Sequence, residues 1–185
     1  MKKVSHNWQA KKLNYLEIYK EAHNNAVDLL KESKMFFDSK CYSRSYFLAF
    51  TALEEVSKSQ LAADVFTGIS KEEDFLKFYR DHQDKIKRVR WAHHDANSFP
   101  YNSRWIGPDQ DDIEIVAPKE PILKNRMDAL YVDFDINTLL IKSPSERIKL
   151  KDADEIIHIV DVALQRIWEM TEYWGHQIGT KGLMK

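Results

Sequence analysis

An all-α fold is the class that this sequence predicts, and two observations support it. Apolar residues recur at steps of three and four over long stretches, the spacing that places them on one face of a helix. The chain also has 5 Gly and 5 Pro among 185 residues, too few for a sandwich built on many tight turns. We therefore expect one domain spanning residues 1–185, built as a bundle of four long helices and one short helix.

The first two long helices are expected over residues 8–38 and 41–66. The apolar stripe that predicts the second helix consists of Tyr46, Ala49, Phe50, Leu53, Val56 and Leu61. Gly68 follows the end of this helix, where a residue with positive φ commonly stops a helix. At about 100° per residue, Glu54 lies at the border of the stripe and Glu55 lies opposite to it. Apolar side chains occupy most of the circumference, which is typical of a central helix.

Three further helices complete the predicted bundle. The third is expected from Ser70, as its N-cap, to about residue 93. A short helix is expected over residues 121–131, and a final long helix over residues 152–174 with Asp152 as its N-cap. The inward positions of the final helix are Ile156, Val160, Ala163, Leu164, Ile167 and Met170.

A long irregular loop, residues 95–121, is expected between the third helix and the short one. It contains four of the five prolines and an acidic cluster. Loops of this length are uncommon in compact domains and often form lids or binding segments, and a solvated connector is the other interpretation. The sequence leaves both open.

The composition limits the cellular compartment, the partners and the cofactors that can be expected for this chain. With 28 Lys and Arg against 29 Asp and Glu, the net charge of −1 gives no global attraction to nucleic acid or to a membrane. Cys41 is the single cysteine, which excludes an intramolecular disulfide and a multi-cysteine zinc site. No apolar run approaches the ~20 residues of a membrane span, and no signal-peptide core is present. We expect a cytoplasmic protein with no membrane partner, no metal and, because no glycine-rich loop could cradle phosphates, no nucleotide cofactor.

A basic segment lies in the second half of the predicted third helix. Between residues 77 and 94, six Lys and Arg side chains stand against two Asp. The candidate site residues of this segment are His82, Lys85, Arg88, Arg90, His93 and His94. By the helical projection, His82 and His93 point inward. Such a patch suits a phosphate-bearing partner such as RNA, and a solvated basic face is the alternative.

Arg88 and His93 have the chemistry that RNA cleavage without a metal requires. This reaction needs a base for the 2′-hydroxyl, an acid for the leaving 5′-oxygen and positive charge on the phosphorane. Histidine has a suitable unperturbed pKa, and arginine offers a fork of donors to phosphate oxygens. The two residues stand about 140° apart around a helix, so they would bracket a groove.

Two charged residues of the second helix join this set of candidates. Lys58 follows Glu54 by four residues, which is the favoured orientation for an ion pair along a helix. An ordinary ion pair at the border of the core is the simpler interpretation.

Three blocks of this sequence resemble the AbiV family of phage abortive-infection proteins, which is placed in the HEPN superfamily. The first is the aromatic- and alanine-rich run 45–53 leading into Glu54-Glu55-x-x-Lys58. The second is His82-x-x-Lys85, and the third is the run 126–133 before the final helix. Their order and spacing match over residues 10–175. Ser57 departs from the pattern, since the family commonly has Gly before the lysine.

The resemblance implies a HEPN-like bundle, a role in defence against phage, a homodimer and an RNA-cleaving site shared across its two-fold axis. The superfamily motif, Arg-x4–6-His, maps to Arg88 with His93 or His94. In this first hypothesis Arg88 binds the scissile phosphate, His93 transfers protons and Glu54 orients His82 or a neighbouring base. The residues expected to bind substrate are Lys58, Lys85, Arg90 and His94.

Three alternatives stay open at this point. The family residues of the second and third helices could form a buried polar lattice that fixes helix register. The chain could be a non-enzymatic effector that binds a phage or host protein and blocks translation, with Phe99, Tyr101 and Trp105 of the long loop as anchors. Glu155-x-x-His158 has the spacing of a di-iron bundle ligand pair, but no second pair matches it.

Overall fold

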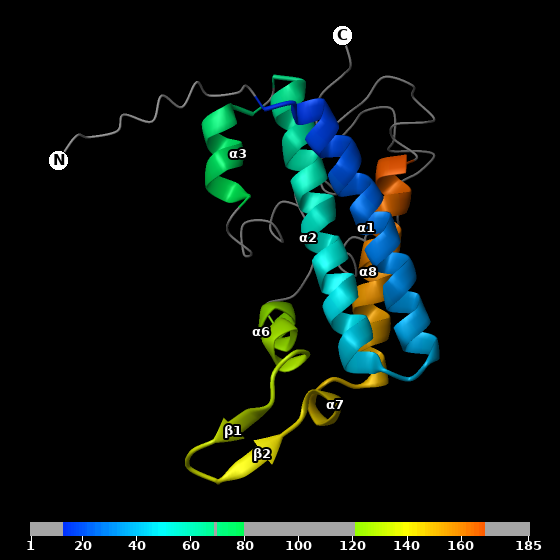
Figure 1. The fold of residues 1–185 in the computed structure, drawn as a ribbon, viewed down its shortest axis with the longest axis vertical. Coiled ribbons are helices and arrows are strands. Elements are labelled where there is room, and N and C mark those ends of the chain that lie inside the picture. The colour runs from blue at the N-terminus through cyan, green and yellow to red at the C-terminus, as the bar shows by residue number, and fades with distance from the viewer. Residues whose placement is uncertain (1–12, 69, 80–120, 169–185) are drawn as a thin grey trace, which may run out of the picture.

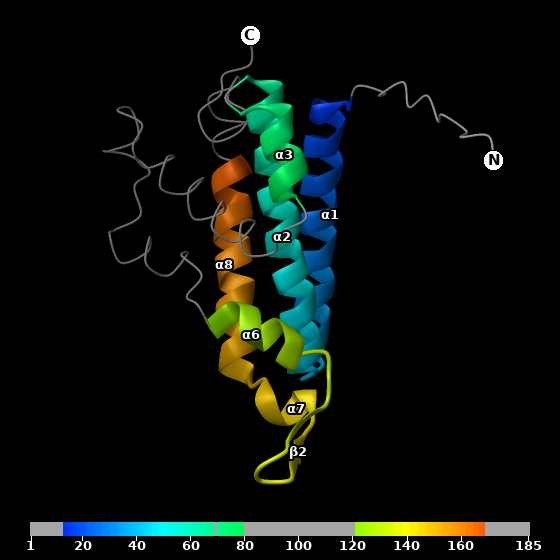
Figure 2. The ribbon, with the colours of Figure 1, turned by 90° about the vertical axis from the view of Figure 1, so that its left-hand side faces the viewer.

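The structure, a computed structural model, describes residues 13–68, 70–79 and 121–168 of the chain. Three long helices form its body: α1 (Tyr15–Asp38), α2 (Tyr42–Phe66) and α8 (Leu150–Trp168). They lie side by side along the long axis of the molecule, as Figure 1 and Figure 2 show. α1 and α2 form an antiparallel pair, and α8 packs against both of them.

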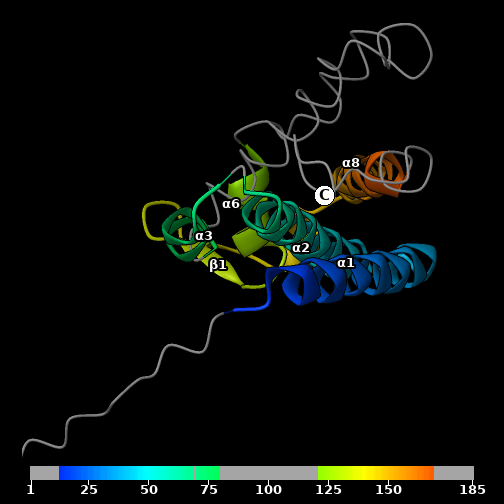
Figure 3. The same cartoon turned by 90° about the horizontal axis from the view of Figure 1, so that it is seen from above.

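Shorter elements surround this body. α3 (Glu72–Phe78) and α6 (Pro121–Asp128) both lie on one side of α2, α3 near one end and α6 near the other (Figure 2). Strands β1 (Asp133–Asp135) and β2 (Leu140–Lys142) form a hairpin, and α7 (Pro144–Arg147) leads from it into α8. In Figure 1 the hairpin projects beyond the end of the bundle. The view from above in Figure 3 shows α1, α2 and α8 with α3 and α6 outside them.

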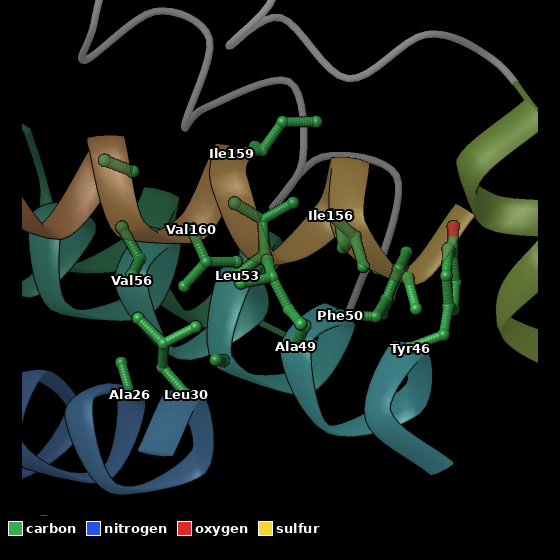
Figure 4. Close-up of a cluster of buried hydrophobic side chains, with 14 of the residues drawn as sticks. Ala26, Leu30, Tyr46, Ala49, Phe50, Leu53, Val56, Ile156, Ile159 and Val160 are labelled. Carbon is green, nitrogen blue, oxygen red and sulfur yellow. The ribbon is translucent and has the colours of Figure 1, made fainter. Parts of the chain in front are cut away.

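The main core lies between the three long helices. Phe50, Leu53 and Val56 of α2 meet Ile156 and Val160 of α8 in Figure 4, and each of these side chains is buried. Small side chains let the helices approach closely: Ala26, Ala49 and Ala52 are fully buried. A second, smaller cluster joins α3 to the body, and its members are Tyr15, Leu61, Ala62 and Phe75.

The predicted all-α class is confirmed, and so is the apolar stripe of α2, whose six residues are all buried. Gly68 has φ +81° and follows the Thr67 cap, as the sequence predicts. The predicted start of the first helix near residue 8 is too early, because Leu13 and Asn14 are not helical. α1 begins at Tyr15, where the Asn14 side chain accepts a hydrogen bond from the Glu17 amide at 3.2 Å. The predicted inward residues of the final helix from Ile156 to Leu164 are buried.

Two predicted N-caps are wrong by one to three residues. α3 is capped at Lys71, whose amide donates to the Asp74 carboxylate at 3.2 Å, so Ser70 precedes the cap. α8 begins at Leu150, and the Lys149 amide donates to the Asp152 carboxylate at 2.8 Å. Both acidic residues therefore stand at the third helical position, because a carboxylate there can reach back to the cap amide.

The hairpin was not expected from the sequence. Val132 to Ile136 alternates apolar and acidic residues, which is the period of a strand and the signal that could have predicted it. A four-residue turn follows, in which the Asp135 carboxylate accepts hydrogen bonds from the Asn137 and Thr138 amides at 2.8 and 3.2 Å. The predicted short helix is accordingly shorter than expected and ends at Asp128.

Candidate functional site

The most unusual feature of the described residues is a line of buried polar side chains along α2. Glu54, Ser57, Gln60 and Asp64 follow one another at steps of three, three and four residues, which places them on one face of the helix. Counted over the whole residue, none is more than 5% exposed. We call these four residues the polar stripe. A polar group taken out of water lowers stability unless it gains partners, so a helix face of this kind is expected where the fold needs its chemistry.

Towards the start of α2 the same side of the helix contacts α6. The hydroxyl of Tyr46 hydrogen-bonds to the side chain of Asn125, and burial raises the pKa of this hydroxyl. The guanidinium of Arg126 lies over the Phe50 ring, with its carbon 5.5 Å from the ring centroid. α6 therefore presents an amide and a cation to the side of α2 on which Glu54 lies.

Arg126 also faces Glu54. Its Nη2 lies 4.0 Å from Oε2 of Glu54, which is too long for a hydrogen bond, so the contact is electrostatic. Both side chains are largely withdrawn from solvent, at 22% and 7% exposure, and the attraction is screened less than at the surface. The positive charge of Arg126 thus compensates for the burial of the Glu54 carboxylate.

Lys58 pairs with a different glutamate from the one expected. Its ammonium contacts the carboxylate of Glu55, three residues before it on α2, and both side chains are partly buried. The predicted Glu54–Lys58 pair is therefore wrong. The reason lies in the tertiary structure. The Glu54 side chain faces Arg126 of α6, whereas Glu55 and Lys58 lie at partly exposed positions of α2.

A second arginine connects α6, α7 and the hairpin. Nη2 of Arg147 on α7 lies 2.9 Å from Oδ1 of Asp128, and Nη1 donates to Oδ2 of Asp133 on β1. Arg147 and Asp128 are mostly buried, while Asp133 is exposed. One guanidinium therefore holds three elements together, using the forked donors that arginine offers to carboxylates.

The candidate residues divide between the described and the remaining parts of the chain. Glu54 and Lys58 both lie on α2, but Glu54 faces Arg126 whereas Lys58 pairs with Glu55. The other six candidates lie outside the described residues: His82, Lys85, Arg88, Arg90, His93 and His94. The chain that carries them leaves from Tyr79 after α3 and returns at α6, and these two helices lie on the same side of α2 (Figure 2).

The two members of the predicted di-iron pair, Glu155 and His158, are both exposed on α8. Among residues 13–68, 70–79 and 121–168, no group of three or more His, Cys, Asp or Glu side chains could hold a metal ion. Within the same residues no helix is both long enough and apolar enough to cross a bilayer.

Sequence reasoning missed several residues of this site. Ser57, Gln60 and Asp64 could have been found by continuing the helical projection from Glu54, which places all four on one side of α2. Arg126 and Asp128 lie in the block quoted for the family resemblance, but nothing in the sequence says which acidic or cationic groups they contact. Their partners are 19 to 72 residues away and depend on how α6 docks.

The comparisons with known proteins agree with the resemblance. A family model described as AbiV, of the HEPN type, matches residues 14–165, which is most of the chain. Searches of curated proteins and of solved structures found no match.

Proposed function

The chain belongs to the AbiV family of abortive-infection HEPN proteins, and from this premise we propose that it acts in the cytoplasm as a metal-independent endoribonuclease. Its RNA-cleaving site would be shared between two copies of the chain. In this proposal Arg88 binds the scissile phosphate and His93 transfers protons. Lys85, Arg90 and His94 steer the RNA.

The observation that supports the proposal is the burial of Glu54, the first residue of the polar stripe. A carboxylate in this setting, close to the Arg126 charge, can fix the orientation of an imidazole that donates a hydrogen bond to it. We propose this role of Glu54 towards His82. The described ends of the segment that carries His82, α3 and α6, both lie on the Glu54 side of α2, and this placement supports the assignment.

Lys58 has a more distant part in the proposal. It is partly exposed and paired with Glu55, so its ammonium is available near the surface for a phosphate only when that pair opens. Substrate binding by Lys58 would therefore be weaker than binding by an unpaired cation. We propose that it contributes to attraction of the RNA backbone and not to the chemical step.

The test is cleavage of end-labelled single-stranded RNA by the purified full chain in the presence of EDTA. We expect products with 2′,3′-cyclic phosphate ends, and loss of cleavage in His93→Ala. The matched control is His158→Ala, which removes an exposed histidine of α8 outside the candidate site and should leave the rate unchanged. Equal cleavage by His93→Ala and the wild type would contradict the assignment.

Glu54→Gln separates a positioning role from a structural one. If Glu54 orients a base, this variant loses cleavage and its pH–rate profile shifts, while most of its thermal stability remains. If Glu54 serves only the Arg126 contact, stability falls and cleavage per folded molecule is unchanged. Arg126→Met gives the comparison, because it removes the charge facing Glu54 and keeps an apolar stem over Phe50.

The second candidate function is capture of a phage or host protein by a non-enzymatic effector. Its predicted anchors in the loop, Phe99, Tyr101 and Trp105, lie outside the described residues. It stays a prediction from the sequence. Absence of RNA cleavage under conditions in which the protein protects cells from phage would make it the leading hypothesis.

A further inference from the structure

The hairpin and the turn before it expose an unusual amount of apolar surface. Of the 14 large hydrophobic side chains exposed in the described residues, eight lie between Met127 and Ile141. These eight are Met127, Tyr131, Val132, Phe134, Ile136, Leu139, Leu140 and Ile141, and each is more than half exposed. Exposed apolar residues that concentrate in one short segment, as opposed to residues scattered over the whole surface, point to an interaction surface.

The register of the hairpin places all charged residues of the two strands on one face. Phe134 pairs with Ile141 across the two strands, and Asp133 pairs with Lys142. Because side chains alternate between the faces of a ribbon, Phe134 and Ile141 share one face, and Asp133 and Lys142 share the other. The first of these, the apolar face, has no charged side chain from either strand. Phe134 is 69% exposed and Ile141 is 71% exposed.

An isolated hairpin of this size is not stable by itself. Two short strands in water are marginal unless a third strand or another layer packs on them. Here each strand pairs with the other, and the hairpin extends beyond the end of the helical body in Figure 1 and Figure 2. What anchors it to the body is Arg147, which binds Asp133 on the charged face. The apolar face is therefore presented outward in a fixed orientation.

We propose that a second copy of this chain packs on the hairpin, apolar face against apolar face, about a two-fold axis. Charge supports this partner, since two identical faces without charged side chains meet without repulsion. Area supports it too. Phe134 and Ile141, with Val132 and Ile136 that continue the alternation of β1, are each more than half exposed and offer on the order of 500 Å² per chain, which is at the small end of specific interfaces.

Face-to-face packing is favoured over pairing at the strand edges. If β1 paired with β1 of a second copy about Phe134, Asp133 would stand opposite Asp135 of the other chain, and like charges directly opposite each other are destabilising. Carboxylates on an edge strand also block pairing with other chains in general. Edge pairing would in addition leave Phe134 and Ile141 exposed.

The inference rests on the homodimer of the proposed function and names its interface, but it does not depend on RNA cleavage. The first experiment is sedimentation equilibrium of the full chain over a range of concentrations. We expect a dimer whose dissociation constant rises at least about tenfold in the double variant Phe134→Ser, Ile141→Ser. The control is Met35→Ser, which removes an equally exposed side chain from α1 and should leave association unchanged. A wild type that stays monomeric, or a double variant that associates as tightly as the wild type, overturns the proposal.

The second experiment tests the geometry without relying on loss of association. In a Cys41→Ser background the chain has no other cysteine, so a single new thiol reports its own surroundings. Ile141→Cys should give a covalent dimer with a short bismaleimide, and Leu140→Cys, the next residue but on the opposite face, should give several-fold less. Equal yields, or a larger yield from Leu140→Cys, overturn face-to-face packing.

The two proposals can fail separately. A wild-type dimer that loses association in the double variant but never cleaves RNA supports the interface and contradicts the ribonuclease. A monomeric double variant that cleaves RNA at the wild-type rate supports the interface and contradicts a site shared between two copies.

Discussion

α2 and the β1–β2 hairpin depart from the usual distribution of polar and apolar side chains in opposite directions. α2 keeps Glu54, Ser57, Gln60 and Asp64 away from water, whereas the hairpin holds Phe134, Leu140 and Ile141 in it. α2 has α1, α3, α6 and α8 around it, and these elements can supply partners to its polar groups. The hairpin projects from the bundle and has no second layer within the described chain. The partners of α2 are therefore internal, whereas the partner that we propose for the hairpin is external.

The two regions also differ in what a substitution should cost. A residue in the α2 core loses packing that nothing replaces, because interiors are close-packed. A residue on the exposed face of the hairpin loses little in a single chain, since water already surrounds it. A substitution there should weaken association with a second chain and leave the stability of the single chain nearly unchanged.

The largest expected effect comes from the pair Phe50→Ala and Phe134→Ala. Phe50 is fully buried, and its truncation should lower the free energy of unfolding by about 3–5 kcal/mol. Phe134→Ala should change it by less than about 0.5 kcal/mol when measured at concentrations where the chain is monomeric. Urea denaturation followed by circular dichroism measures both. Similar losses in the two variants would show that the hairpin is packed within a single chain.

An intermediate effect is expected from Arg147→Met, which cuts the link between the two regions. The variant leaves Asp128 without the guanidinium 2.9 Å away and releases Asp133 of β1. Breaking a largely buried pair leaves a poorly solvated charge, so we expect a loss of about 1–3 kcal/mol. The change should be accompanied by faster amide hydrogen exchange in β1 and β2 than in the core of α2.

The control for Arg147→Met is Lys34→Met. Lys34 contacts Asp161 at 2.9 Å between α1 and α8, but both side chains are about half exposed. Solvent screens that pair, and its removal should cost less than about 0.5 kcal/mol. A larger loss from Lys34→Met than from Arg147→Met would contradict the assignment of Arg147 as the anchor of the hairpin.

The smallest effect concerns the hairpin turn and acid pH. The amides of Asn137 and Thr138 hold the pKa of Asp135 below its usual value of 3.8 by hydrogen-bonding to the carboxylate. Because the pKa of Asp135 is lower in the folded chain than in the unfolded chain, the ionised carboxylate stabilises the turn at pH values above the unfolded pKa. This contribution is lost as the pH falls from about 3.8 through the folded pKa. Amide chemical shifts of the two residues should therefore change in that range.

Asp135→Asn is the matched variant, because an asparagine oxygen can accept the same hydrogen bonds but does not titrate. Its Asn137 and Thr138 shifts should be flat over the range in which the wild type changes. An unchanged acid transition in Asp135→Asn would assign the transition to another carboxylate. The core of α2 should show no corresponding local change at the onset of this transition.

Helix positions and the core stripe could be predicted because they depend on local periodicity. The α2 stripe from Tyr46 to Leu61 and the α8 residues from Ile156 to Leu164 were found in this way, and the structure buries them. The hairpin was missed although Val132 to Ile136 alternates strictly, because five residues of alternation are a short signal beside a helical pattern. The two N-caps were misplaced because Asp74 and Asp152 satisfy cap amides from the third helical position.

What the sequence by itself determined is the helical class, the extent of α2, the buried face of α8, and the family to which the chain belongs. It also brought Glu54 into the candidate site. The tertiary structure alone decided that Glu54 faces Arg126, that Lys58 pairs with Glu55, and that Arg147 joins α6 to the hairpin. The physical reason is that periodicity tells which residues share a face of a helix. How deeply that face is buried, and which charged groups contact it, depend on elements distant in sequence that pack against the helix.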